Sequence, residues 1–424
     1  MKKFKKIVSI VIVVVLTIAF VTAMVNIGVT EGLKKHGNSY SAVEIPEKLV
    51  PEKDKNGNWV FTTDRDFKIM HLTDVHIGAG FISYERDKSA LNAVAAMITA
   101  EKPDLVIVTG DIAFPVPYQA GTLNNKNGAV AFAELMESLG VYWAVTFGNH
   151  DTEAYSYYSR EKISKFYSDD KFEHCLYEAG PDDVDGYGNQ IIEVKNSQGI
   201  ITQACVLMDS HSYTDGDIFG IFWKYDNIHK NQVEWYKSEI ARMNKENKEA
   251  IGKVKKSDGL SEKYTPVKTL AFFHIPLVEM LDGWTEFQNN SFKDTADFKY
   301  IDGIVGETGK RIFSGIGEDD LFEAMLETGS TKAIFNGHDH YNNVTFSYKG
   351  VIFSYGYSID YLAYSGVSGY GSQRGCTMIT VKPDGDFEIN KYNYYSDRYD
   401  LEGFTREEVT MQFEDIKYEV ADTE

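Results

Sequence analysis

Five short motifs rich in Asp, His and Asn each follow an apolar run of the sequence. They offer carboxylate, imidazole and amide oxygen ligands, which together suit borderline divalent or trivalent ions such as Mn, Fe, Zn or Co. The pattern therefore predicts a dinuclear metal site. The motifs span residues 73–78, 110–111, 148–151, 273–276 and 336–340, and their candidate ligands are Asp74, His76, Asp111, Asn149, His274, His338 and His340.

Spacing within two motifs separates the candidate ligands from their neighbours. In residues 74–76 and 338–340 the outer residues are two positions apart, so they lie on the same side of an extended strand end. The middle residues, Val75 and Asp339, then point away and are not expected to be ligands. A single carboxylate can bridge two ions about 3.5–4 Å apart, and Asp111 is the candidate for that role.

Alternating strands and helices must position these motifs. Apolar runs of strand length alternate with segments that carry apolar residues on one helical face, which is typical of an α/β layered domain. In open α/β sheets, ligand sites form outside the carboxyl ends of the strands. The expected strands are 67–72, 105–109, 142–147, 204–208, 269–273, 333–335 and 351–355, and the expected helices are 89–100, 128–139, 231–243 and 320–327.

The five motifs, in this order, resemble those of the calcineurin-like metallophosphoesterase superfamily. The resemblance covers roughly residues 67–390, and the phrases FFHIPL (272–277) and GHDHYNN (337–343) are similar to one branch of it. That branch contains phosphatases of bacteria, fungi and plants, and the plant proteins are often called purple-acid-phosphatase-like. The resemblance implies an α/β fold in which two mixed β-sheets, flanked by helices, make a four-layer sandwich.

The same resemblance implies a role for each candidate residue. A hydroxide activated by the two ions would attack phosphorus, without a covalent phospho-enzyme. His150 and Asn149 would contact the substrate phosphate, and His150 would protonate the departing oxygen, which suits a pKa of about 6.5. The resemblance assigns one ion to Asp74, His76, Asp111 and His340, and the other to Asp111, Asn149, His274 and His338.

Two positions depart from the pattern of relatives. Purple acid phosphatases owe their colour to a tyrosine three residues after the bridging aspartate, whereas this chain has Phe114 there, so no purple colour is expected. In the protein serine/threonine phosphatases an Asp at that position orients the catalytic histidine and an Arg follows it. Here Phe114 and Pro115 supply neither group, so the candidates for orienting His150 are Asp151 and a backbone carbonyl.

The N-terminus combines a basic end with an apolar run. Residues 7–25 carry no charge, and such a run behind lysines is either a secretory signal or a membrane anchor. Its length is nearer the roughly 20 residues of a membrane span, which favours an uncleaved anchor, although residues 21–23 form an acceptable cleavage pattern. Either way the remainder is expected outside the membrane, anchored at the cell surface or secreted. The lysines are Lys2, Lys3, Lys5 and Lys6.

These observations give a division of the chain. We expect a signal anchor or signal peptide at residues 1–28, and at 29–65 a stalk that leads into the following domain. The metallophosphoesterase domain is expected at 66–395, followed by an acidic C-terminal extension at 396–424. The extension has Phe404, Met411, Phe413 and Tyr418 as the side chains by which it would dock.

Composition excludes several classes of protein. The 424 residues include 43% hydrophobic and 25% charged side chains, which excludes wholesale disorder. A net charge of −20 disfavours nucleic acid as a partner, because phosphate contacts need clustered Lys and Arg. Cys175, Cys205 and Cys376 cannot form a disulfide framework and have no C-x-x-C spacing. The expected partners are a phosphate ester, either a small molecule or a phosphoprotein, and the membrane.

The remaining histidines and one glycine-rich segment receive structural interpretations. His71 is expected to pack within the first strand, and the others are also expected to be structural; His211, which follows an apolar run, is the one of them whose position could bring it to the rim. Residues 366–375 are expected to form a mobile loop, in which Arg374 is a candidate contact for substrate phosphate. The histidines of this group are His36, His71, His174, His211 and His229.

Three functions are compatible with these features. The preferred one is metal-dependent hydrolysis of phosphate monoesters on the outer side of the membrane. The second is a phosphodiesterase or nucleotide pyrophosphatase that uses the same dinuclear site. The third is a membrane-tethered envelope protein with a relic site, which ranks last because relics normally lose ligands and none is missing here.

Overall fold

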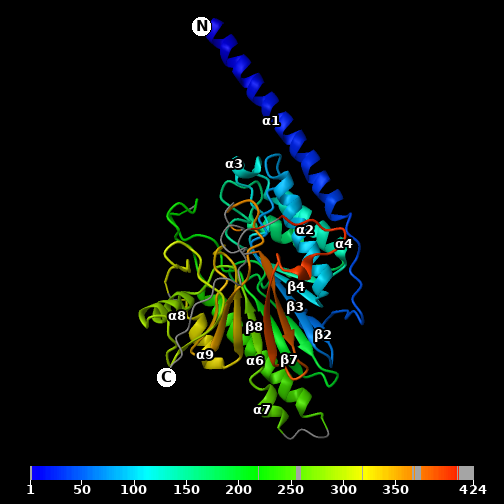
Figure 1. The fold of residues 1–424 in the computed structure, drawn as a ribbon, viewed down its shortest axis with the longest axis vertical. Helices are drawn as coiled ribbons and strands as arrows, with labels where there is room; N and C mark the ends of the chain where they lie inside the picture. Colours follow the sequence, from blue (N-terminus) through cyan, green and yellow to red (C-terminus); the bar gives the residue numbers. More distant parts are fainter. Residues whose placement is uncertain are drawn as a thin grey trace.

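Two mixed β-sheets packed face to face form the centre of the computed structural model (Figure 1). The structure describes residues 2–217, 219–254, 259–317, 319–364, 367, 374–407 and 409. Within these residues the larger sheet has nine strands and the smaller sheet has five. Helices flank both sheets, which confirms the α/β sandwich predicted from the sequence.

The smaller sheet carries the first three predicted strands. Its order is β14-β13-β3-β4-β5, in which β3, β4 and β5 run parallel and β13 runs antiparallel to both of its neighbours. Apolar runs such as LVIVT in β4 are buried at every position, as expected for parallel strands covered on both faces. The strands are β3 (Phe67–Leu72), β4 (Leu105–Thr109), β5 (Trp143–Thr146), β13 (Gly375–Val381) and β14 (Phe387–Asn393).

The larger sheet has the order β1-β2-β6-β7-β8-β10-β12-β11-β9. Its middle strands β7, β8, β10 and β12 are parallel, so their carboxyl ends meet at one edge of the sandwich. The strands are β1 (Glu52–Lys53), β2 (Trp59–Thr62), β6 (Gln190–Lys195), β7 (Ile201–Leu207), β8 (Thr269–Phe272), β9 (Phe298–Asp302), β10 (Thr331–Asn336), β11 (Thr345–Tyr348) and β12 (Val351–Tyr355).

Apolar cores lie between the sheets and beneath the helices on each side. The inter-sheet core includes Phe67 and Ile107 from the smaller sheet and Phe272 and Phe335 from the larger one. Helices α2 and α4 cover the smaller sheet, while α6, α8 and α9 cover the larger one. The helices are α1 (Lys2–Gly37), α2 (Tyr84–Glu101), α3 (Pro117–Ala120), α4 (Asn125–Leu139), α5 (Arg160–Tyr167), α6 (Lys230–Ile251), α7 (Leu260–Tyr264), α8 (Val278–Asn289) and α9 (Leu321–Thr328).

Helix α1 projects from the domain at the top of Figure 1. Among the described residues it is a helix long and apolar enough to cross a membrane. Its C-terminal turns lie against the domain, where Leu33 is fully buried in the core under α2 and α4. The segment 29–65, expected as a stalk, therefore includes the end of α1, and it also contributes β1 and β2 to the larger sheet.

The chain beyond residue 395 folds back onto the smaller sheet's side. It begins with a short 3-10 helix, Asp397–Tyr399, and Arg398 donates hydrogen bonds to Glu101 at the end of α2. Phe404 stacks on Tyr40 with ring centroids 5.3 Å apart, so it docks as predicted. The other three expected docking residues, Met411, Phe413 and Tyr418, lie outside the described residues.

Candidate metal centre

The five predicted motifs follow the carboxyl ends of β3, β4, β5, β8 and β10. Asp74, His76 and Asp111 each have a positive φ of 52–53°, and His338 has a φ of 82°. Non-glycine residues rarely adopt this left-handed conformation, which costs about 1–2 kcal/mol per residue. The chain thus accepts backbone strain where it turns these side chains toward one another.

One group of candidate ligands comes from β3, β4 and β10. The possible ligand atoms of Asp74, His76, Asp111 and His340 all lie within 4.8 Å of one another, and all four residues are buried. His76 Nε2 lies 3.5 Å from Asp111 Oδ2, and His340 Nε2 lies 3.4 Å from Asp74 Oδ1. These separations exceed ordinary hydrogen bonds, so the atoms face a common point without pairing tightly.

A second group shares the carboxylate of Asp111. His274 Nε2 lies 3.2 Å from Asp111 Oδ2 and 3.2 Å from Asn149 Oδ1. The His338 ring is half-buried, with its centroid 5.2 Å from that of His274. The structure thus brings all seven predicted ligands together, with Asp111 between the two groups.

The polar atoms of the centre fit bound cations. Both ring nitrogens of His76 and Asp111 Oδ2 are buried without a hydrogen-bond partner, and such atoms are costly unless something compensates them. Burial would lower the pKa values of His274 and His340, yet the carboxylates of Asp111 and Asp74 raise each to about 9. The buried negative charge therefore demands nearby positive charge, and this mixture of carboxylate, imidazole and amide oxygen suits transition-metal ions.

Neighbouring groups fix which nitrogen two of the imidazoles present. His274 Nδ1 donates to the carbonyl oxygen of Thr109 at 2.7 Å, and His340 Nδ1 donates to Asp360 Oδ2 at 2.9 Å. Both contacts leave Nε2 facing the centre, which is how histidine ligands are usually oriented. The sequence did not predict this role for Asp360, which lies five residues beyond the end of β12, further from its strand than the predicted ligands are from theirs.

His150 lies at the edge of the centre and is oriented by Glu153. His150 Nδ1 lies 2.7 Å from Glu153 Oε1, and Glu153 also accepts a hydrogen bond from Tyr213 at 3.1 Å. Burial would lower the pKa of His150, but the charge of Asp111 and the hydrogen bond to Glu153 raise it. The backbone amide of His150 donates to Asp111 Oδ1 at 2.8 Å.

The expectation that Asp151 or a backbone carbonyl orients His150 is therefore wrong. The Asp151 carboxylate instead accepts the backbone amides of Asp111, Ala113 and Gly148 at 2.8–2.9 Å. These three hydrogen bonds occupy the Asp151 carboxylate and fix the conformation of the loop. The turn after His150 instead brings Glu153, three residues further along the chain, beside the His150 ring. A His-x-x-Glu spacing just after a strand end was the sequence signal for this partner.

Neighbours of the candidate ligands point away as expected. Val75 is buried in the core of the smaller sheet, and Asp339 Oδ2 accepts hydrogen bonds from Tyr355 at 2.5 Å and from the Phe313 amide at 3.0 Å. Phe114 packs its ring against His150, with centroids 5.0 Å apart.

Two other histidines lie in separate surroundings. His71 is buried with Nε2 2.7 Å from Thr109 Oγ1, so it packs within its strand as predicted. His211 pairs with Gln232 at 2.9 Å and stacks on His229, with ring centroids 4.0 Å apart. Together with Asp226, these two imidazoles form a group apart from the seven candidate ligands.

Arg374 does not serve as the predicted phosphate contact. Its guanidinium is buried over the Tyr361 ring and donates to the carbonyl oxygen of Asp360 at 2.6 Å and to Glu407 at 2.9 Å. The Arg374 guanidinium therefore stabilises the segment that carries Asp360 and does not face the candidate metal centre. In the loop expected to be mobile, residues 366 and 368–373 lie outside the described residues.

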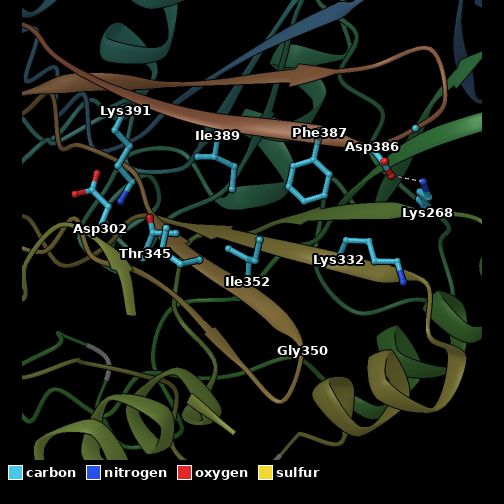
Figure 2. A pocket seen from close by; sticks show the side chains of 12 residues that line it. Lys268, Asp302, Lys332, Thr345, Gly350, Ile352, Asp386, Phe387, Ile389 and Lys391 are labelled. Atoms are coloured by element: carbon cyan, nitrogen blue, oxygen red, sulfur yellow. Dashed lines mark hydrogen bonds and ion pairs between the residues drawn. The ribbon is translucent and has the colours of Figure 1, made fainter. Parts of the chain in front are cut away.

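A cavity of about 570 Å³ lies elsewhere, where β14 faces the strands of the larger sheet (Figure 2). Ile352 and Ile389 line its apolar middle, with Lys391 near Asp302 at one end and Lys268 at the other. None of the predicted site residues lines this cavity. The candidate metal centre is thus an open rim of strand ends, distinct from this cavity.

Fold and centre together define a metal-dependent phosphoesterase, a hydrolase. A model of the family described as calcineurin-like phosphoesterase matches residues 67–342, so the chain belongs to that family.

Several known proteins are similar to the chain. It is 26% identical to "Probable inactive purple acid phosphatase 14" of Arabidopsis thaliana over an alignment of 342 residues, and this alignment covers 76% of each protein. It is 25% identical over 298 residues to phosphatase DCR2 of Saccharomyces cerevisiae, covering 66% of this chain and 45% of the yeast protein. Among solved structures, a dimetal phosphatase from Danio rerio is similar with a TM-score of 0.47 and 13% identity, covering 78% of this chain and 97% of the other.

Proposed function

We propose that this protein hydrolyses phosphate monoesters, with two transition-metal ions, on the outer side of a membrane. The observation that carries the proposal is the buried cluster in which Asp111 lies between two groups of imidazole and carboxylate ligands. One ion would be held by Asp74, His76, Asp111 and His340, and the other by Asp111, Asn149, His274 and His338.

When bound there, the ions would supply Lewis acidity, which lowers the pKa of water toward neutrality and neutralises phosphoryl oxygens. The protein contributes orientation and a proton. Thr109 and Asp360 hold the imidazoles of His274 and His340 with Nε2 toward the centre. Glu153 occupies Nδ1 of His150, so Nε2 is the atom that would donate a proton to the leaving oxygen.

Asn149 and His150 are the proposed contacts for the substrate phosphate. Asn149 Nδ2 donates to the Tyr213 hydroxyl at 3.0 Å, and this contact fixes its amide with the oxygen toward His274. The His150 side chain is 27% exposed, whereas the candidate ligands other than the half-buried His338 are buried. It is therefore accessible to a substrate that approaches the rim from solvent.

We further propose that α1 is a signal anchor. Its lysines would remain inside while the domain lies at the cell surface. We retain the boundaries drawn from the sequence: the anchor at 1–28, the lead-in segment at 29–65, the catalytic domain at 66–395 and the acidic extension at 396–424.

The test compares two model substrates on the purified, metal-loaded full-length protein. p-Nitrophenyl phosphate should be hydrolysed much faster than bis-p-nitrophenyl phosphate, and Asp111→Asn should abolish the activity. The reverse preference would replace the proposal by a phosphodiesterase or nucleotide pyrophosphatase. Because three similar Arabidopsis proteins are named as probable inactive phosphatases, bound metal is measured in parallel. Fewer than one ion per chain after loading would favour a non-catalytic envelope protein.

A further inference from the structure

Helix α1 leaves the domain beside the candidate metal centre. The Asn26 side chain donates to the carbonyl oxygen of Gly121 at 3.0 Å and accepts the Phe81 amide at 3.0 Å. Phe81 lies in the loop after β3, and Gly121 lies in the loop after β4. These are the strands that deliver Asp74 and Asp111, so α1 is fixed to the rim of the centre.

The length of the apolar run in α1 puts the membrane surface at the level of Asn26, where α1 contacts the rim of the candidate metal centre. Residues 7–25 rise about 28 Å as a helix, close to the thickness of a bilayer's hydrocarbon core. Their large apolar side chains are exposed, from Ile7 at 60% to Val25 at 45%. A bilayer around this run would end at Asn26, and α3 lies on the side of the domain from which α1 projects (Figure 1).

Exposed apolar side chains gather on the loops of this rim. We call them the rim patch. These loops, together with the short helix α3, follow the carboxyl ends of β3, β4, β5 and β7, the edge at which the candidate ligands lie. Aromatic residues favour the membrane–water interface, where one end of the ring is apolar and the other wet. The patch comprises Phe81, Ile82, Tyr118, Tyr157, Phe219, Ile221, Phe222 and Trp223, which are 47–78% exposed.

The loop that carries Phe219, Phe222 and Trp223 begins and ends beside the candidate metal centre. Tyr213 and Tyr225 pair across the base of this loop. Tyr213 accepts a hydrogen bond from Asn149 at 3.0 Å, and the Tyr225 ring lies 4.2 Å from that of His338. Trp223, 62% exposed, therefore projects from a loop that starts and ends beside two candidate ligands.

We infer that the rim patch rests on the membrane and that the substrates are lipids with a terminal phosphate monoester, an inference that rests on the function proposed above. A site for soluble esters needs no apolar rim, whereas a lipid phosphate lies at the level where this rim meets the bilayer. In the reaction, water oxygen joins phosphorus and the ester P–O bond breaks. The attacking water loses one proton to solvent, the lipid oxygen takes a proton from His150, and His150 regains one from solvent, so the products are the lipid alcohol and inorganic phosphate.

The first test uses the full-length, metal-loaded protein in phosphatidylcholine vesicles that contain phosphatidic acid. The double variant Phe222→Ser/Trp223→Ser should release phosphate from these vesicles about tenfold more slowly than the unmodified protein, because it loses apolar contact with the bilayer. Its hydrolysis of p-nitrophenyl phosphate should be unchanged. The matched control Val50→Ser/Leu326→Ser removes exposed apolar side chains outside the rim patch and should alter neither activity.

A second test does not depend on catalysis. Vesicles with brominated acyl chains should quench the tryptophan fluorescence of the full-length protein, and Trp223→Phe should remove most of that quenching. If the protein hydrolyses p-nitrophenyl phosphate but not phosphatidic acid in vesicles, the inference is overturned while the proposed function stands. If the protein hydrolyses neither p-nitrophenyl phosphate nor phosphatidic acid, the proposed function fails. If Trp223 is not quenched by the brominated vesicles, the inference that the rim patch rests on the membrane is overturned.

Discussion

Replacing Glu153 by Ala should impair the proton donor while leaving the metal ligands in place. Glu153 is 6% exposed and its Oε1 lies 2.7 Å from His150 Nδ1. The carboxylate stabilises the imidazolium and fixes the direction of Nε2, so its loss should affect the transition state in which the proton moves. Glu153→Gln keeps an oxygen acceptor without the charge and should lie between the wild type and Glu153→Ala.

The structure sets the size of the effect. A hydrogen bond to a charged group contributes about 1.5–3 kcal/mol, which corresponds to about a 10- to 150-fold change in kcat. The His150 side chain is 27% exposed, so solvent screens the pair and the lower end applies, about 10- to 30-fold. KM should change little, because the substitution leaves the His150 ring, Asn149 and the metal ligands in place for the substrate phosphate.

The decisive assay compares leaving groups. β-Glycerophosphate releases an alkoxide that needs a proton, whereas p-nitrophenyl phosphate releases a stable phenolate that does not. Glu153→Ala should therefore lose several-fold more kcat on β-glycerophosphate than on p-nitrophenyl phosphate. The control is Glu161→Ala, since Glu161 is exposed on α5 and pairs with nearby Lys165 on the same helix. Equal losses on both substrates, or loss of bound metal, would refute the assignment of Glu153 as the residue that positions His150.

Three further predictions concern the shared ligand, the packing behind it and the cavity of Figure 2. Asp111→Asn should reduce bound metal and lower activity at least about 100-fold, measured by elemental analysis and phosphate release. Gly337→Ala should also lower activity, because its Cβ would lie 1.8 Å from Thr73 Oγ1, whereas Gly252→Ala meets atoms at 3.4 Å or more and should behave like wild type. Burial lowers the pKa of Lys391 to about 7, so above that pH the unfolded chain binds a proton that the folded chain lacks, and the free energy of unfolding rises with pH. Lys391→Met should flatten that rise in urea titrations between about pH 7 and pH 9; an unaltered slope would contradict the assignment.

The strands and the ligand-bearing motifs could be predicted because both follow local patterns. An apolar run such as that of β4 reads as a buried strand, and the polar residue after it must lie at the strand's carboxyl end. The predicted helix at 89–100 lies within α2, and the one at 320–327 agrees with α9 to within one residue. These features need only the neighbouring sequence.

Partners that arrive from distant segments were harder to predict. Glu153 lies three residues from His150, but choosing it over Asp151 requires the geometry of the turn. Asp360 reaches His340 from the end of another strand, and Arg374 turns inward because Asp360 and Glu407 both accept from it. Such choices depend on which groups are already hydrogen-bonded, and that follows from the packed fold.

The contacts of Arg374 have a consequence for how the protein matures. Glu407 holds Arg374, Arg374 holds the Asp360 backbone, and the Asp360 side chain orients His340. A nascent chain on the ribosome thus exposes Asp74 and His76 long before it synthesises the residues that complete their surroundings. Support of His340 therefore depends on a residue far along the chain from Asp74 and His76, and a product truncated before Glu407 would fold with Arg374 and Asp360 less firmly held.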